Sequence, residues 1–192
     1  MSQRHLRSKK IAFLGLMLAL IIVLLWIERM LPPLPFLPPH MKLGISNVVI
    51  MFVLLFVGVK ESFTLVVLKA VFNMLMRGPV GGLLSLSGGF LSVLIIASLV
   101  WIFKHRISYI ALSITGAILH NAGQIIIFCV IMQNWRLLLV YSPILLVAGT
   151  ILGTLSGILL KVLLPSLNKF HHGFGGEKSK NTSRTESDRT NL

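Results

Sequence analysis

The strongest constraint on this chain is a series of long apolar runs separated by short charged or proline-rich segments. A helix needs roughly 20 predominantly apolar residues, within a range of about 17 to 25, to cross the hydrocarbon core of a bilayer. Six stretches meet or approach that length: 11–30, 43–59, 62–77, 82–103, 107–132 and 137–164. The sequence therefore predicts an all-α integral membrane bundle of six transmembrane helices.

The charge content agrees with a membrane protein. Charged residues form 12% of the chain, whereas soluble domains carry about 25%. Glu28 and Glu61 are the acidic residues that lie in the apolar body. The first apolar run is longer than a signal-peptide core and no small-residue cleavage site follows it, so we expect it to remain as a helix. Cys129, flanked by apolar residues, is predicted to be a small membrane-facing residue.

The distribution of lysine and arginine predicts the orientation of the bundle. With the N-terminus inside, thirteen basic residues lie on the cytoplasmic side and four (Arg29, Lys42, Arg77 and Arg136) lie outside. We therefore expect a multi-pass protein of the plasma membrane with both termini in the cytoplasm. It would have a basic cytoplasmic N-terminus (1–10), a six-helix transmembrane domain (11–164) and a disordered basic cytoplasmic tail (165–192). The tail's charge favours contact with the anionic lipids of the bilayer over nucleic acid, because no aromatic or RNA-binding motif accompanies it.

Polar side chains on three predicted helices would lie at one depth in the outer half of the membrane. Lys69, Asn73 and Arg77 are spaced four residues apart and share a helix face, as do His120 and Gln124. Ionisable residues within a span are by default a functional-site hypothesis, and the alternative is that they hydrogen-bond to each other and lock the bundle. The residues predicted to line a substrate pocket are Asn47, Lys69, Asn73, Arg77, His120, Asn121 and Gln124.

The predicted pocket opens to the outside beneath the proline-rich loop at 32–40, and its charges suggest what it binds. Glu61 lies at the inner end of its helix, so Glu28 alone cannot neutralise both Lys69 and Arg77. An anionic or strongly hydrogen-accepting ligand would supply the missing partner, and neighbouring apolar side chains suit an amphipathic molecule. We expect His120 to act as a hydrogen-bonding group, because no nucleophile lies at a recognisable spacing from it.

Small residues at intervals of four predict faces where helices approach closely. Gly149, Gly153 and Gly157 follow this spacing, and so do Gly15 and Ala19. The partner of such a face is either another helix of the same chain or a second membrane protein. The run "SLSGGFLS" (85–92) leaves open a broken helix, a close approach to a ligand, or tight helix packing.

The residues needed for several kinds of catalysis are missing from the sequence. There is no Gly-x-x-x-x-Gly-Lys-Ser/Thr phosphate loop, and no His, Cys and carboxylate cluster with metal-ligand spacing. Asp188 in the tail is the sole aspartate, whereas magnesium-mediated binding of a diphosphate normally needs paired carboxylates. We therefore predict no catalytic residues, no metal and no cofactor, so the chain is not an enzyme, and any transport would need separate energising subunits.

Three runs in combination resemble a known bacterial family. They are "HMKLGISNVV" (40–49), "SLSGGFLS" (85–92) and "GAILHNAGQ" (116–124), and they resemble the family labelled both Gx transporter and heptaprenyl diphosphate synthase component I. The resemblance extends over residues 9 to 165. That family is similar to the substrate-binding S components of energy-coupling-factor (ECF) vitamin transporters. This implies six helices, both ends inside and a ligand captured from outside.

The resemblance also implies partners. S components use an Ala-x-x-x-Ala type motif on the first helix to contact a membrane coupling subunit, which works with cytoplasmic ATPases. The matching positions here are Gly15 and Ala19, preceded by Ala12, which is a looser version of the motif.

Three functions remain open at this point. The first is a substrate-binding subunit of an ECF-type importer that captures a small amphipathic or anionic molecule, such as a vitamin, quinone or isoprenoid precursor. The second is a noncatalytic membrane subunit that assists heptaprenyl diphosphate or menaquinone side-chain synthesis. The third is a structural or assembly protein without a ligand. Prenyl diphosphate synthases resemble soluble helical proteins with two Asp-rich motifs, which this chain lacks, so the first function is favoured.

Overall fold

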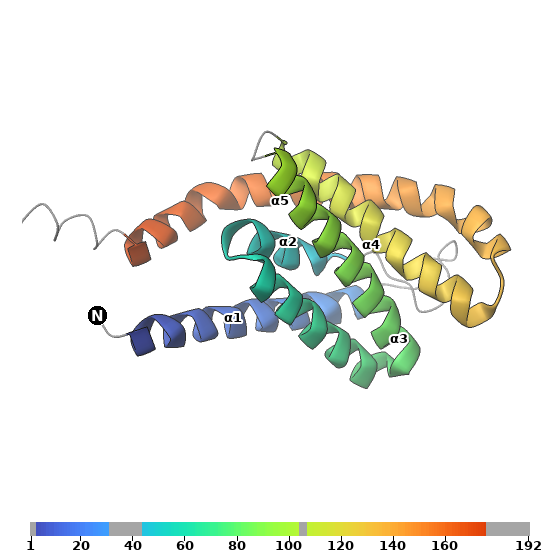
Figure 1. The fold of residues 1–192 in the computed structure, drawn as a ribbon, viewed down its shortest axis with the longest axis horizontal. Coiled ribbons are helices and arrows are strands. Elements are labelled where there is room, and N and C mark those ends of the chain that lie inside the picture. The colour runs from blue at the N-terminus through green and yellow to red at the C-terminus, as the bar shows by residue number, and fades with distance from the viewer. Residues whose placement is uncertain (1–2, 31–43, 104–106, 176–192) are drawn as a thin grey trace, which may run out of the picture.

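A computed structural model of the chain describes residues 3–30, 44–103 and 107–175, and every element in these ranges is a helix (Figure 1). The helices are α1 (Gln3–Met30), α2 (Asn47–Phe56), α3 (Val59–Phe103), α4 (Tyr109–Met132) and α5 (Arg136–Gly175). The proline-rich loop at 32–40 and the last part of the predicted tail lie outside the described residues.

Five helices are therefore counted in the described part, and the prediction of six separate helices is not confirmed. The reason is that the predicted spans 62–77 and 82–103 both belong to α3. Its backbone departs from helical geometry at Gly78 (φ 80°, ψ 177°), immediately before Pro79. A positive φ suits glycine, and proline has no N–H to continue the helix before it. Figure 1 shows the chain reversing its direction between the two arms of α3.

The two arms of α3 pack against each other in antiparallel fashion. The Asn73 amide donates a 3.0 Å hydrogen bond to Ser85 Oγ across the arms. Further from the turn, the rings of Phe63 and Phe90 lie 5.2 Å apart. The contacts thus pair rising numbers on one arm with falling numbers on the other. α3 is a helical hairpin closed at Gly78.

The predicted second span and the predicted start of the tail also need correction. The second span was expected over 43–59, but α2 has 10 residues and rises only about 15 Å, half of a hydrocarbon core of about 30 Å. Four of the described helices (α1, α3, α4 and α5) are long and apolar enough to cross a membrane. The predicted start of the tail at residue 165 falls inside α5, which continues to Gly175.

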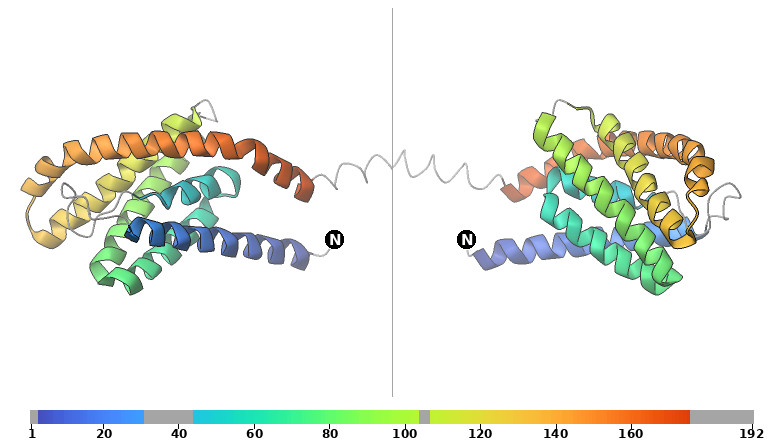
Figure 2. Two further views of the ribbon diagram at one scale, coloured as in Figure 1. Left: turned by 180° about the vertical axis from the view of Figure 1, so that it is seen from behind. Right: turned by 45° about the vertical axis from the view of Figure 1, so that its right-hand side comes forward.

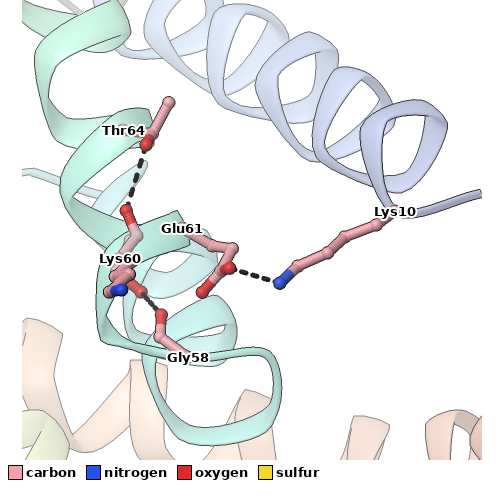
Figure 3. Close-up of polar contacts among 6 residues, drawn as sticks. Lys10, Gly58, Lys60, Glu61 and Thr64 are labelled. Atoms are coloured by element: carbon pink, nitrogen blue, oxygen red, sulfur yellow. Dashed lines mark hydrogen bonds and ion pairs between the residues drawn. The ribbon is translucent and has the colours of Figure 1, made fainter. Parts of the chain in front are cut away.

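The start of α1 and the end of α5 lie at the same end of the bundle, as both Figure 1 and Figure 2 show. We call this the terminal end; the opposite, turn end carries Gly78 and the α4–α5 connection. At the terminal end, Lys10 of α1 forms an ion pair with Glu61 in the first turn of α3 (Figure 3). The Lys10 side chain is 51% exposed, so we expect this pair to contribute little to stability.

The apolar core has two parts. The larger lies mainly among α1, α2 and α3 and includes Ile21, Val53 and Leu65, each without exposed surface. Leu112 of α4 and Leu160 of α5 also belong to it. The smaller lies between α3, α4 and α5 and includes Cys129, which is also fully buried. The prediction that Cys129 faces the membrane is therefore wrong, because α5 crosses α4 and the residues around Cys129 pack against Leu145.

Small residues decide how closely α4 and α5 approach. A Cβ atom added to Gly153 would lie 2.5 Å from Ile114 Cα, and one added to Gly157 would lie 2.7 Å from Ile110 Cα. The glycines of α5 therefore meet a helix of the same chain, which is one of the two partners predicted for them. Gly15 on α1 differs, because a Cβ atom there would have no described neighbour within 4 Å.

The two glycine-containing motifs pack directly on each other. Ser87 donates a 3.0 Å hydrogen bond to the Gly123 carbonyl, and Ser92 donates one of equal length to the Gly116 carbonyl. A Cβ atom on Gly123 would lie 2.8 Å from Gly88 Cα. Of the three alternatives for "SLSGGFLS", the structure excludes a broken helix, because α3 continues through the motif, and it shows tight packing at Gly88. Gly89 and Ser92 line a cavity, so the close approach to a ligand stays a prediction.

Candidate functional site

A small polar cavity lies towards the turn end, between α1, the two arms of α3 and α4. Its lining residues are Leu25, Glu28, Gly44, Lys69, Asn73, Arg77, Gly81, Leu84, Ser85, His120 and Gln124. Several of its polar side chains are almost fully buried: 3% of Lys69, 2% of His120 and 5% of Gln124 is exposed. The cavity has ≈ 20 Å³ for the centres of water molecules, which is enough for one or two waters.

The structure brings together most of the residues that the sequence predicted as a pocket. Lys69, Asn73, Arg77, His120 and Gln124 all line this cavity. Asn47 borders it through a hydrogen bond, since Lys69 Nζ donates to Asn47 Oδ1 at 2.5 Å. The spacing of four residues accounts for this grouping, because it keeps Lys69, Asn73 and Arg77 on one face of the first α3 arm.

Asn121 is the member of the predicted set that the structure places elsewhere. It is buried, but it does not line the cavity, and its amide donates a 3.1 Å hydrogen bond to the Leu145 carbonyl of α5. Adjacent helical residues point about 100° apart, so Asn121 leaves the face that His120 occupies. For this residue, the alternative of a side chain that locks the bundle describes its contacts.

Sequence reasoning treated Glu28 only as a counter-charge and did not place it or Gly44 in the site. Glu28 is 4% exposed and accepts a 2.5 Å hydrogen bond from the Gly44 N–H. Gly44 has φ 77°, and a Cβ atom there would lie 2.8 Å from Asn47 Nδ2 and 3.2 Å from His120 Cδ2. The signal that could have found Glu28 is a lone carboxylate inside a predicted span.

The charges in the cavity are only partly compensated among the described residues. Lys69 has the neutral amide of Asn47 as its hydrogen-bond partner. Arg77 Nη2 is buried and has no hydrogen-bond partner within the described ranges. Glu28 supplies one negative charge to the lining. Because leaving charged groups buried and unpaired is costly, this arrangement is suited to binding an anionic group.

A second cavity, mostly apolar, adjoins the first between α2, the second arm of α3, α4 and α5. Its lining residues are Gly44, Asn47, Val48, Ile50, Met51, Leu54, Gly89, Ser92, Val93, Ser113, Gly116, Ala117, Leu152 and Ser156. It has ≈ 30 Å³ for the centres of water molecules. Gly44 lines both cavities. Sequence reasoning missed this cavity because apolar residues in a membrane protein carry no signal of which ones line a space.

No group of three His, Cys, Asp or Glu side chains within the described ranges could hold a metal ion. The site's donors are instead amines, a guanidinium, amides and hydroxyls, which bind anions and hydrogen-bond acceptors.

The family model described as heptaprenyl diphosphate synthase component I matches residues 17–163. The chain belongs to this family. A solved structure described as the S component of a bacterial ECF transporter is similar, with a TM-score of 0.62 and 22% sequence identity. The match covers 85% of this chain and 98% of that chain. No curated protein matches.

At this identity the likeness shows the fold, so this member of the heptaprenyl diphosphate synthase component I family has the fold of an ECF transporter S component. Its apolar helices and this fold make it a membrane protein. All residues of both cavities lie within the matched stretch. Of the predicted docking residues, Ala19 lies inside the matched stretch, whereas Ala12 and Gly15 precede it.

Proposed function

We propose that this chain is the substrate-binding membrane subunit of an ECF-type importer and captures a small amphipathic or anionic molecule from outside the cell. The observation that carries this proposal is a buried cavity with more positive than negative lining groups in a protein with the S-component fold. A membrane protein that needs these charges only for packing would gain more from pairing them.

The lining residues have separate roles in this proposal. Lys69 and Arg77 attract the anionic end of the ligand, and Asn47 holds the Lys69 ammonium in place. Asn73, His120 and Gln124 supply hydrogen bonds. None of these groups has a catalytic role, so we propose that the chain is not an enzyme and that separate subunits provide the energy for transport.

The proposed partner of the first helix is a membrane coupling subunit that works with cytoplasmic ATPases. Ala12, Gly15 and Ala19 are all exposed on α1, and no described atom lies within 4 Å of a Cβ atom at Gly15. A partner helix could therefore approach this stripe of small residues closely.

A second candidate function is a noncatalytic membrane subunit that assists heptaprenyl diphosphate or menaquinone side-chain synthesis. The observation that favours it is the description of the family model. Purification from the native membrane separates the two: a stoichiometric coupling subunit with ATPases supports the importer, and a stoichiometric prenyl synthase supports the alternative.

Substitutions of Gln124 and Asn121, two buried amides of α4, should have opposite effects: one lowers the affinity for the ligand and the other lowers the stability of the protein. Gln124→Leu is expected to lower affinity for the bound molecule roughly fivefold or more, because a ligand group loses its hydrogen bond. Its stability should stay near that of wild type. Asn121→Leu removes the bond to the Leu145 carbonyl, so it should cost about 1 to 3 kcal/mol of stability and leave affinity unchanged.

The measurement is mass spectrometry of small molecules retained by the detergent-purified protein, combined with thermal unfolding of each variant. A retained molecule that is lost in Gln124→Leu and kept in Asn121→Leu supports the site. If Gln124→Leu retains the molecule as wild type does, the proposed pocket is wrong.

The orientation of the bundle can be tested with two basic residues at its opposite ends. Lys60 and Arg136 are both exposed, and Cys129 is fully buried and should not react. We expect Arg136→Cys to be labelled on whole cells by a membrane-impermeant thiol reagent, and Lys60→Cys to be labelled only after permeabilisation. The reverse pattern would place both termini outside and contradict capture of the ligand from outside.

A further inference from the structure

We infer that the ligand is an apolar monocarboxylate whose charged end occupies the polar cavity and whose apolar body occupies the adjoining cavity. This inference rests on the proposed function and narrows its substrate to one chemical class.

The charge of the polar cavity points to a single negative charge on the ligand. Among the described lining residues, Lys69 and Arg77 carry positive charges and Glu28 carries a negative one, which leaves one positive charge with His120 counted as neutral. Arg29 is exposed next to this region, where solvent screens it. A monocarboxylate would neutralise the lining, whereas a diphosphate would leave an excess of buried negative charge, which is costly.

The junction of the two cavities lies at Gly44. This residue lines both spaces, and it has φ 77°, a conformation that glycine adopts readily. A Cβ atom there would lie 2.8 Å from Asn47 Nδ2 and 3.2 Å from His120 Cδ2. Glycine therefore keeps side-chain atoms out of the junction, and Glu28 holds its N–H in position.

The adjoining cavity fits an apolar body. Val48, Met51, Leu54 and Leu152 contribute to its lining, and burial of apolar surface against such side chains favours binding. Ser113 Oγ also lines it, and this hydroxyl is buried without a hydrogen-bond partner in the described part of the chain. Because the two spaces hold only a few waters' volume, we expect the surrounding side chains to move apart when the body enters.

Three probes that share one apolar body test the class: 3-phenylpropanoate, 3-phenylpropanol and 3-phenylpropyl diphosphate. Their Kd values would be measured by isothermal titration calorimetry on the detergent-purified full chain, with micelle blanks. We expect the carboxylate to bind about tenfold more tightly than either of the other two, the size of effect that one charged hydrogen-bonded contact provides.

Two charge variants make the test sharper. Glu28→Gln keeps an acceptor for the Gly44 N–H but removes the negative charge. The affinity for the diphosphate, relative to that for the carboxylate, should therefore rise about tenfold. Arg77→Gln removes a positive charge at a partly exposed position and should abolish the preference for carboxylate over alcohol. Using both variants keeps the test decisive if one of them fails to fold.

A matched pair on α4 tests the apolar cavity. Ala117 lines this cavity, whereas Ala111 is exposed on the same helix. Ala117→Leu should weaken all three probes about fivefold by filling the space, and Ala111→Leu should leave them unchanged. Equal effects of the two substitutions on the Kd values would show that the apolar body of the ligand does not occupy this cavity.

Several results would overturn the inference: wild type preferring the diphosphate, carboxylate and alcohol binding equally, an unchanged ratio in Glu28→Gln, or no binding of any probe. These results concern only the ligand class. The proposed function fails separately, if the purified chain retains no small molecule whose retention depends on Gln124.

Discussion

Replacing Gly153 with alanine is expected to lower the free energy of unfolding by about 3 kcal/mol or more, the cost of overpacking a closely packed interface. The new Cβ atom would lie 2.5 Å from Ile114 Cα and 2.9 Å from the Ser113 carbonyl oxygen. Both are backbone atoms, so no side-chain rotation relieves the clash and α5 must move away from α4. Alanine's better helix propensity, worth at most about 1 kcal/mol, cannot offset this.

Gly15→Ala is the matched control, because no described atom lies within 4 Å of the added Cβ atom. We expect this substitution to leave stability unchanged or to raise it by about 0.5 kcal/mol. Thermal and denaturant unfolding of both variants in the same detergent measure the difference. Equal stabilities would show that α4 and α5 are not in close contact at Gly153.

A bulky residue in the stripe of small residues on α1 (Ala12, Gly15 and Ala19) is expected to abolish assembly with the energising subunits while leaving this chain folded. Ala19 is exposed in the structure, so tryptophan fits there without disturbing the described core. It would, however, prevent the close helix approach that small residues permit. We expect Ala19→Trp to lose the coupling subunit and ATPases on purification from native membranes, together with energised uptake.

Leu20→Trp provides the comparison for this prediction. Leu20 is 43% exposed on the same helix, but it lies outside the stripe formed by Ala12, Gly15 and Ala19, so we expect normal assembly. Quantitative mass spectrometry of the purified complexes, with thermal unfolding to confirm folding, gives the result. Assembly of Ala19→Trp at wild-type levels would place the docking face elsewhere.

Several features followed from the sequence because they depend on short-range periodicity. Apolar runs predicted the helices, and the family was recognised from three short runs and confirmed by a match over residues 17–163. The interval of four residues placed Lys69, Asn73 and Arg77 on one face, and all three line the polar cavity. These are properties of a single helix, and they do not require knowledge of its neighbours.

Other features needed the path of the chain through space. The predicted break between the third and fourth spans became a hairpin within α3, because Gly78 and Pro79 reverse the chain in a tight turn. Cys129, expected to face lipid, is buried by the crossing of α4 and α5. The apolar cavity was not predicted at all, since its lining comes from four helices whose relative positions no local pattern specifies.

The sequence by itself therefore determined which apolar segments form helices and which faces carry polar or small residues, because helical periodicity is a local property. Only the tertiary structure decided what each face meets. Asn121 and Gln124 are both buried amides on α4, yet one bonds the Leu145 carbonyl and the other lines the cavity. Gly15 and Gly153 both belong to stripes of small residues, yet one is open and the other lies against α4. The physical reason is that a side chain's role depends on which helix packs opposite it, and that depends on contacts between segments far apart in the chain.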